Sequence, residues 1–151
     1  MSTQLSPHFT LEELTTTKTG ISNIPNDNEV NQLRLLCRDI LEPLREEISN
    51  RYGHRDVSGW PEFIPLIVDS GYRSAAVNKS VGGVPTSQHI LGQAADIHSS
   101  IDTKYLYLTI ISMVSKGQLN VGQCIWYRNS HFVHVSLPTN THKNQFIIKN
   151  K

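Results

Sequence analysis

The segment 70–100, SGYRSAAVNKSVGGVPTSQHILGQAADIHSS, decides how this chain is interpreted, because it combines reactive side chains with turn formers. It holds one arginine, two histidines and one aspartate, together with five glycine or proline residues. Such a run is too polar for a core element, and glycine and proline are typical of turns. The segment therefore predicts a shaped loop that carries polar side chains to one place.

Two candidate metal ligands lie in this segment. His89 and Asp96 are seven positions apart, with Gly92 and two alanines between them, so a turn can bring the imidazole and the carboxylate near one point. Nitrogen and oxygen donors suit zinc, and catalytic zinc usually has three protein ligands and one open position. A third ligand must therefore come from elsewhere in the chain.

The run HFVHVSL, residues 131–137, has the pattern of a strand and offers the third ligand. With a period of two, Phe132, His134 and Ser136 share one face, whereas His131 points to the other. A strand holds ligand geometry firmly, so His134 is the best candidate. Spacing alone does not specify a metal site, since single histidines are more often hydrogen-bonded and single aspartates often cap an element.

Four stretches of the chain resemble the zinc D-alanyl-D-alanine carboxypeptidase family, in the expected order. They are FTLEEL, NIPNDNEVNQLRLLCRDILEPLRE, SGYRSAAVNKSVGGVPTSQHILGQAADI and FVHVS. The likeness is to the small single-domain branch, with its DD- and LD-peptidases and phage endolysins that cut peptidoglycan stem peptides. The resemblance implies a hedgehog/DD-peptidase-like zinc fold in which His89, Asp96 and His134 bind one Zn²⁺ ion.

The resemblance also implies roles for three residues near the ligands. Arg73, in SGYRS, matches the basic residue expected near the substrate's carboxylate or carbonyl, and an arginine fork can clamp a carboxylate through two hydrogen bonds. A structural salt bridge is the alternative for Arg73. Ser87 and Gln88 precede the first ligand and are candidates for substrate binding, or for shaping the loop and hydrogen-bonding that ligand.

The chain departs from its relatives at the catalytic acid. Relatives usually carry an acid just ahead of the last histidine ligand, at the end of an IWE or IYE run or three residues before the ligand. Here these positions hold Tyr127 and His131, and no Asp or Glu follows Asp102. Imidazole has a pKa suited to proton transfer, so His131 is the predicted general base, although its strand face argues against it. An upstream acid such as Glu62 is the alternative, and Tyr127 is a candidate hydrogen-bond donor to an oxyanion.

These features favour a zinc metallopeptidase that hydrolyses an amide bond in peptidoglycan stem peptides, as a DD-carboxypeptidase or an LD-endopeptidase of endolysin type. The missing acid favours an alternative. In that alternative the chain is a zinc-containing module, weakly active or inactive, that binds cell-wall peptide or a protein partner.

The composition is that of an ordinary globular chain, with 151 residues, 38% hydrophobic and 18% charged. We expect a single domain, 1–151, and a monomer. Six bases and no acid lie in 103–151, but they are scattered as on a solvated face, which argues against nucleic-acid binding. The N-terminus lacks a signal-peptide pattern, and no apolar run approaches the roughly 18 residues of a membrane span. We therefore expect synthesis in the cytoplasm, no membrane insertion, and a phage-type enzyme acting on the bacterial cell wall.

Periodicity predicts an α+β fold with a small, mostly antiparallel sheet and flanking helices. Thr10 and Glu13 have the spacing of a capping box, and Pro43 should bend the helix in which it lies. The remaining predicted elements are helices over 30–48 and 102–116, strands within 64–74, 122–127 and 131–137, and an edge strand over 145–149.

Overall fold

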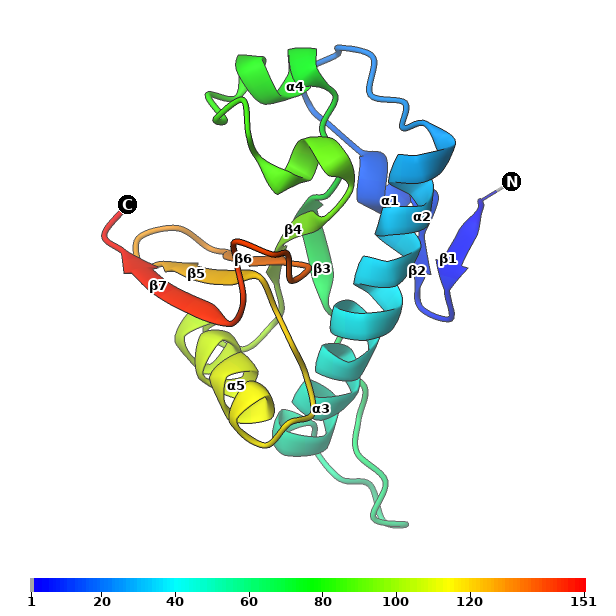
Figure 1. Ribbon diagram of the computed structural model, residues 1–151. Coiled ribbons are helices and arrows are strands. Elements are labelled where there is room, and N and C mark those ends of the chain that lie inside the picture. Colours follow the sequence, from blue (N-terminus) through cyan, green and yellow to red (C-terminus); the bar gives the residue numbers. More distant parts are fainter. Residues whose placement is uncertain (1) are drawn as a thin grey trace.

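A five-stranded mixed sheet organises the fold in the computed structural model, which describes residues 2–151 (Figure 1). Neighbouring strands are antiparallel except for β5 and β7, which run parallel. The predicted α+β class with a small, mostly antiparallel sheet is confirmed. In spatial order the strands are β3 (Ile67–Ser70), β4 (Ala94–His98), β6 (Val133–Ser136), β5 (Gln123–Tyr127) and β7 (Gln145–Lys149).

The alternation of side chains along the two central strands separates a core face of the sheet from a site face. On β6, Val133 and Val135 are completely buried in the core, and His134 between them faces the other side. On β4, Ile97 is likewise buried in the core, and Asp96 faces the same side as His134. The same period of two that packs the core therefore displays the polar residues.

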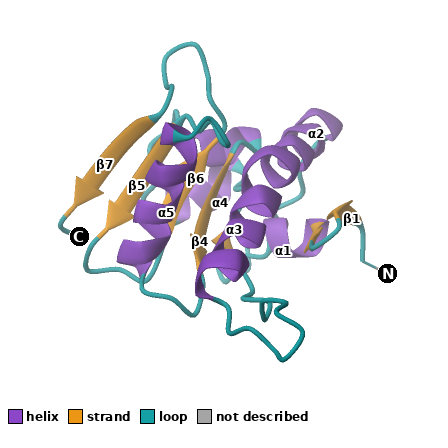
Figure 2. Ribbon diagram, turned by 90° about the horizontal axis from the view of Figure 1, so that it is seen from below, coloured by secondary structure: helices purple, strands orange, loops and turns teal. Residues whose placement is uncertain are grey.

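Helix α5 (Thr103–Ser115) covers the core face, where Figure 2 shows it lying along the sheet. Asp102 caps it by accepting a hydrogen bond from the backbone N–H of Lys104 at 2.9 Å. Leu106 and Ile110 on its inner side are completely buried. This helix closes the core and leaves the opposite face of the sheet free for a site.

A long helical segment packs against the same core (Figure 1). It consists of α2 (Asp27–Leu36), a π-helical stretch (Cys37–Leu41) and α3 (Glu42–Tyr52). Pro43 lies in the first turn of α3, where a missing backbone donor is tolerated, and the wider π turn precedes it. A π-helical stretch thus lies where Pro43 was predicted to bend or divide the helix. Within residues 2–151, none of the helices combines the length and the hydrophobicity that a membrane span requires.

The segment 70–100 contains two short helices, although its glycine and proline residues predicted a loop. Helix α4 (Ala75–Ser80) begins after Ser74, whose hydroxyl accepts a hydrogen bond from the backbone of Val77. A 3₁₀ helix, η2 (Gln88–Leu91), follows the glycine-rich turn. The predicted loop is therefore partly helical, because serine side chains satisfy the free donors at both helix starts.

The N-terminal region forms a small hairpin that the sequence pattern did not indicate. Its strands, β1 (Gln4–Ser6) and β2 (Phe9–Thr10), are too short to show a period. Helix α1 (Leu11–Thr15) follows, and Thr10 and Glu13 form the predicted capping box at its start.

Glu42, at the start of α3, fastens this hairpin to the long helical segment. One carboxylate oxygen accepts hydrogen bonds from Ser6 Oγ at 2.6 Å and from the backbone N–H of His8 at 2.8 Å, and the other lies 2.7 Å from His8 Nδ1. Burial acts to raise the pKa of Glu42, but the hydrogen bonds from Ser6 and His8 outweigh it and lower that pKa. A depressed pKa means that the carboxylate stabilises the fold at neutral pH and ceases to do so as the pH falls through that pKa.

We expect Glu42→Gln to lower the free energy of unfolding by about 1–3 kcal/mol at neutral pH, because the hydrogen bonds lose a charged acceptor. The deficit should begin to shrink as the pH falls below about 4, near the ordinary pKa of a glutamate, and should vanish only once the pH has fallen through the lowered pKa of Glu42. Urea unfolding of both proteins across this pH range measures the effect. Glu46→Gln changes an exposed carboxylate one turn further along the helix and serves as the control. A deficit that does not vary with pH contradicts this role of Glu42.

Candidate metal centre and active site

Two neighbouring strands bring the first pair of candidate ligands together. Asp96 of β4 and His134 of β6 are directly opposed in the antiparallel register, and His134 Nδ1 lies 3.0 Å from Asp96 Oδ1. His89, from η2, places its Nε2 at 3.3 Å from the same oxygen. The three donor atoms lie within 4.8 Å of one another, close enough to hold one metal ion. The structure thus brings together the three residues predicted as ligands.

A backbone carbonyl fixes the orientation of His89. Its Nδ1 lies 2.7 Å from the carbonyl oxygen of Gly71, which can only accept, so Nδ1 carries the proton and Nε2 keeps its lone pair. Metal-binding histidines are commonly oriented by such a partner. Gly71 also needs to be glycine, because a Cβ there would lie 2.4 Å from the carbonyl oxygen of Leu14.

Gly92 makes the turn between the first two ligands. It caps η2 with φ of 72°, in the left-handed region, and leads into β4. A Cβ at this position would also lie 2.5 Å from the carbonyl oxygen of Glu29. Glycine alone meets both conditions without strain, which accounts for its place between His89 and Asp96.

Arg73 holds the second oxygen of Asp96. Its Nη2 donates to Asp96 Oδ2 at 3.0 Å and its Nε donates to Ser70 Oγ at 3.0 Å, which leaves Asp96 Oδ1 facing the two histidines. Burial acts to raise the pKa of Asp96, but the hydrogen bonds and charges of His134 and His89 hold it well below its usual range. Asp96 is therefore an ionised carboxylate although only 6% of the residue is exposed. Arg73 lies at the site as predicted, and its ion pair matches the structural alternative.

The protonation states of the cluster suit a metal ion. Burial lowers the pKa of His134, against the opposing effect of Asp96, so the neutral imidazole is favoured. Ligation requires neutral imidazoles and an ionised carboxylate, and two nitrogens with one oxygen are a donor set of catalytic zinc sites. The residues present therefore fit the predicted zinc ion.

The cluster opens onto a cavity of about 680 Å³ on the site face of the sheet. Tyr127 of β5 and Phe132, just before β6, line this cavity with their ring centroids 5.0 Å apart. Burial, and after it the charge of Asp96, raises the pKa of Tyr127, so its hydroxyl stays protonated at neutral pH. Tyr127 is thus a hydrogen-bond donor beside the cluster and is unsuited to act as a base.

His131 does not line this cavity. It borders a separate hollow together with His98, Asp102 and Arg128, since the chain turns before β6 and the two histidines of 131–137 diverge. This placement argues against the predicted role of His131 as the general base. Glu62, the alternative, is likewise not part of the wall around the cluster.

Ser87 and Gln88 both line the cavity, but their polar atoms serve the loop. Ser87 Oγ accepts a hydrogen bond from the backbone N–H of His89 at 3.2 Å. Gln88 Nε2 donates to the carbonyl oxygen of Leu137 at 3.0 Å, and its buried Oε1 has no hydrogen-bond partner within residues 2–151. These contacts favour the loop-shaping alternative, and substrate binding by either residue stays a prediction.

The sequence motifs did not indicate the residues near the C-terminus that line the cavity. His142 precedes β7, Lys149 ends it and Lys151 follows it, and all three line the cavity. No motif marks these residues. The available signal was the composition of 103–151, which holds bases and no acid.

Comparison with protein families shows to which family the chain belongs. A family model described as Peptidase M15 matches residues 7–136, a range that includes the three candidate ligands, Arg73 and Tyr127. No curated protein sequence matches the chain. The family match covers most of the chain and confirms the resemblance that the motifs indicate. The chain belongs to the Peptidase M15 family.

Proposed function

We propose that this chain is a zinc peptidase that hydrolyses an amide bond in the stem peptides of bacterial peptidoglycan, in the manner of a DD-carboxypeptidase or an LD-endopeptidase of endolysin type. The observation that carries the proposal is the convergence of His89, Asp96 and His134 on one open cavity, in a member of a peptidase family. When bound, zinc supplies Lewis-acid chemistry toward a carbonyl and toward water.

The chain's own residues prepare this site. Arg73 is a positioning residue, because its guanidinium occupies Asp96 Oδ2 and turns Oδ1 toward the histidines. The carbonyl of Gly71 keeps the proton of His89 on Nδ1, so Nε2 is available as a ligand. Preorganised groups of this kind need no rearrangement when the substrate arrives.

Tyr127 is proposed to donate a hydrogen bond to the carbonyl oxygen of the scissile amide. It occupies the position at which relatives carry an acid, its hydroxyl is protonated, and it lines the same cavity as the cluster. A donor aimed at developing negative charge lowers the barrier of amide hydrolysis. Asp96 is the sole carboxylate on this cavity wall among the described residues, so we expect slow turnover for want of a strong base.

One observation favours a second function, that of a binding module. Asp96, the one acidic side chain that the described residues place on the cavity wall, is already paired with Arg73 and two histidines and is not free to accept a proton. A module that retains the metal centre and binds wall peptide without cleaving it needs no such acid.

Incubation of the zinc-loaded protein with defined muropeptides, followed by mass spectrometry, tests the proposal. We expect a new pair of fragments from one amide bond, and no fragments from the His134→Ala protein. His131→Ala should retain wild-type cleavage, because His131 borders a different hollow. Binding of a muropeptide without any fragment establishes the binding module instead, and a loss of cleavage in His131→Ala restores that residue as the base.

A further inference from the structure

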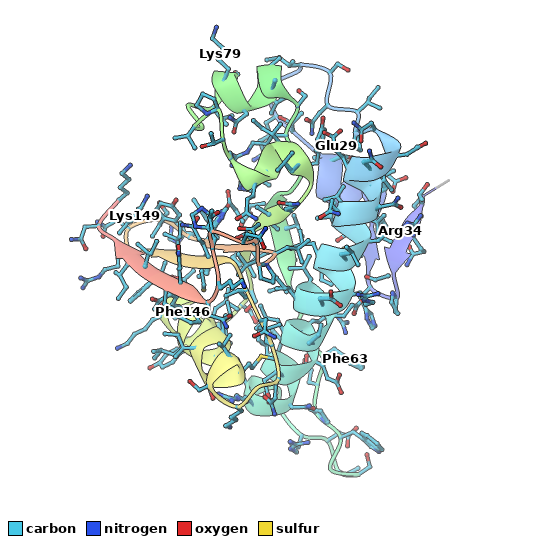
Figure 3. All side chains as sticks on the ribbon, viewed as in Figure 1. Glu29, Arg34, Phe63, Lys79, Phe146 and Lys149 are labelled. Carbon is cyan, nitrogen blue, oxygen red and sulfur yellow. The ribbon has the colours of Figure 1, made fainter. Side chains whose placement is uncertain are left out.

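The edge strand β7 contributes a cation to the wall of the active-site cavity. Lys149, its last residue, pairs with Tyr127 of β5 in the parallel register, and its Nζ lies 5.7 Å from the centroid of the Tyr127 ring. Figure 3 shows Lys149 at the C-terminal end of this strand, with Phe146 on the side of α5. Since β7 lies beyond residue 136, this feature is not part of the region matched by the family model.

The backbone around Lys149 is held in place. Its carbonyl accepts a hydrogen bond from the backbone N–H of Arg128 at 2.9 Å, and the carbonyl of Lys151 accepts one from Asn129 at 2.8 Å. The lysine therefore projects from an ordered strand next to the site, and its position relative to Tyr127 is set by the sheet.

The ammonium group of Lys149 forms no ion pair with the part of the chain that the structure describes. Within residues 2–151 every ion pair involves other cations, and Lys149 is partly buried against an aromatic ring. A partly desolvated cation of this kind gains more from an anion than a solvated one does. The ammonium group of Lys149 is thus placed to bind a negatively charged group, and the described residues do not provide one.

The charge of the cavity wall also favours the binding of a negative group. Arg73, Lys149 and Lys151 line the cavity, whereas Asp96 is the sole acid there among the described residues. Arg73 is the partner of Asp96, so among the described residues no carboxylate side chain on this wall is left to pair with Lys149. The excess positive charge lies on the side of the cavity formed by β7.

We propose that Lys149 forms a subsite that binds a free carboxylate of the substrate peptide, one that is not part of the scissile amide. The proposal rests on the proposed function, because peptides of the cell wall carry such carboxylates at the C-terminus and on side chains. An ammonium group matches a carboxylate in charge and donates to it a charge-assisted hydrogen bond. Lys149 is then a specificity-determining residue that selects acidic stem peptides over amidated ones.

Two matched peptide pairs test the subsite with the zinc-loaded protein. In one pair the C-terminal carboxylate is replaced by a carboxamide, and in the other a side-chain carboxylate is replaced in the same way. KM from cleavage and Kd from calorimetry are measured for wild type, Lys149→Gln and Lys116→Gln. Lys116 is an exposed lysine at the end of α5 that does not line the cavity, so its variant is the control.

We expect wild type to prefer the carboxylate form of one pair by about tenfold, as one charge-assisted hydrogen bond implies. Lys149→Gln should lose this preference by weakening carboxylate binding alone, and Lys116→Gln should retain it. The pair that shows the effect identifies the C-terminal or the side-chain carboxylate as the ligand. Added salt should weaken carboxylate binding to wild type more than to Lys149→Gln.

The outcomes separate this inference from the proposed function. If wild type cleaves no peptide but calorimetry shows the Lys149-dependent preference, the subsite stands and the peptidase activity does not. If wild type cleaves both members of each pair with equal KM and Kd, the subsite is overturned and the peptidase stands. If Lys149→Gln keeps the wild-type preference, the subsite is likewise overturned, and cleavage by wild type decides the peptidase separately.

Discussion

His89→Ala is expected to release the zinc ion, with a loss of affinity greater than about a hundredfold. Mutation of a residue that only orients a metal ligand typically lowers metal affinity by about 10–100-fold. His89→Ala removes a ligand itself, so its effect should be larger. The variant also leaves the carbonyl of Gly71 without the proton that His89 Nδ1 donates at 2.7 Å. Metal analysis after gel filtration without chelator, together with competition by a zinc-binding dye, measures the effect.

His98→Ala is the matched control for this experiment. His98 ends the strand that carries Asp96, and its Nδ1 lies 2.7 Å from Asp69 Oδ2, outside the ligand cluster. One zinc per chain should remain in this variant. Zinc retained by His89→Ala at the wild-type level removes His89 from the ligand set, whereas zinc absent from the wild type removes the metal centre altogether.

Much of the candidate metal centre was predictable from local patterns, because each candidate ligand carries a local signal. The period of two placed His134 on the face opposite its neighbours, and a turn at Gly92 was expected between the other two ligands. The register that opposes Asp96 and His134 was not predictable, since strand pairing over 38 residues depends on the packing of the whole sheet.

The predicted general base is a case in which two local signals disagreed. The chemistry of imidazole favoured His131, but the turn before β6 directs it to another hollow. The strand pattern had already pointed to this outcome, and the three-dimensional placement agrees with it. The role of Lys149 had no local signal, because it depends on the parallel pairing of β7 with β5.

The same contrast holds for the fold. A strong, local signal such as the capping box at Thr10 gave a correct element. Helix α4 and η2 were missed because each has six residues or fewer, which is too short for an apolar period to appear. Their starts depend on single serine caps within a segment whose composition indicated a loop.

Tyr127→Glu is expected to raise the rate of muropeptide cleavage by about 10²-fold or more over Tyr127→Gln, because a well-placed general base contributes about 10²–10⁴. Tyr127 lines the cavity of the candidate metal cluster, and the resemblance of the motifs implies that it stands where the family carries an acid, yet its raised pKa keeps its hydroxyl protonated. A carboxylate there restores a proton acceptor on the open side of the cluster. Single-turnover rates with zinc-saturated proteins measure the chemical step.

Tyr127→Gln is the control that isolates the base, because glutamine has the shape of glutamate and loses the tyrosine hydroxyl in the same way. Tyr127→Phe measures the hydroxyl separately, and a fall in rate of about 10²-fold is expected if it stabilises an oxyanion. Equal rates for the glutamate and glutamine variants show that a carboxylate at position 127 cannot act as the general base. If wild type and Tyr127→Glu both bind muropeptide and neither cleaves it, the loss of function extends beyond one missing carboxylate, and the binding module replaces the peptidase as the function of this chain.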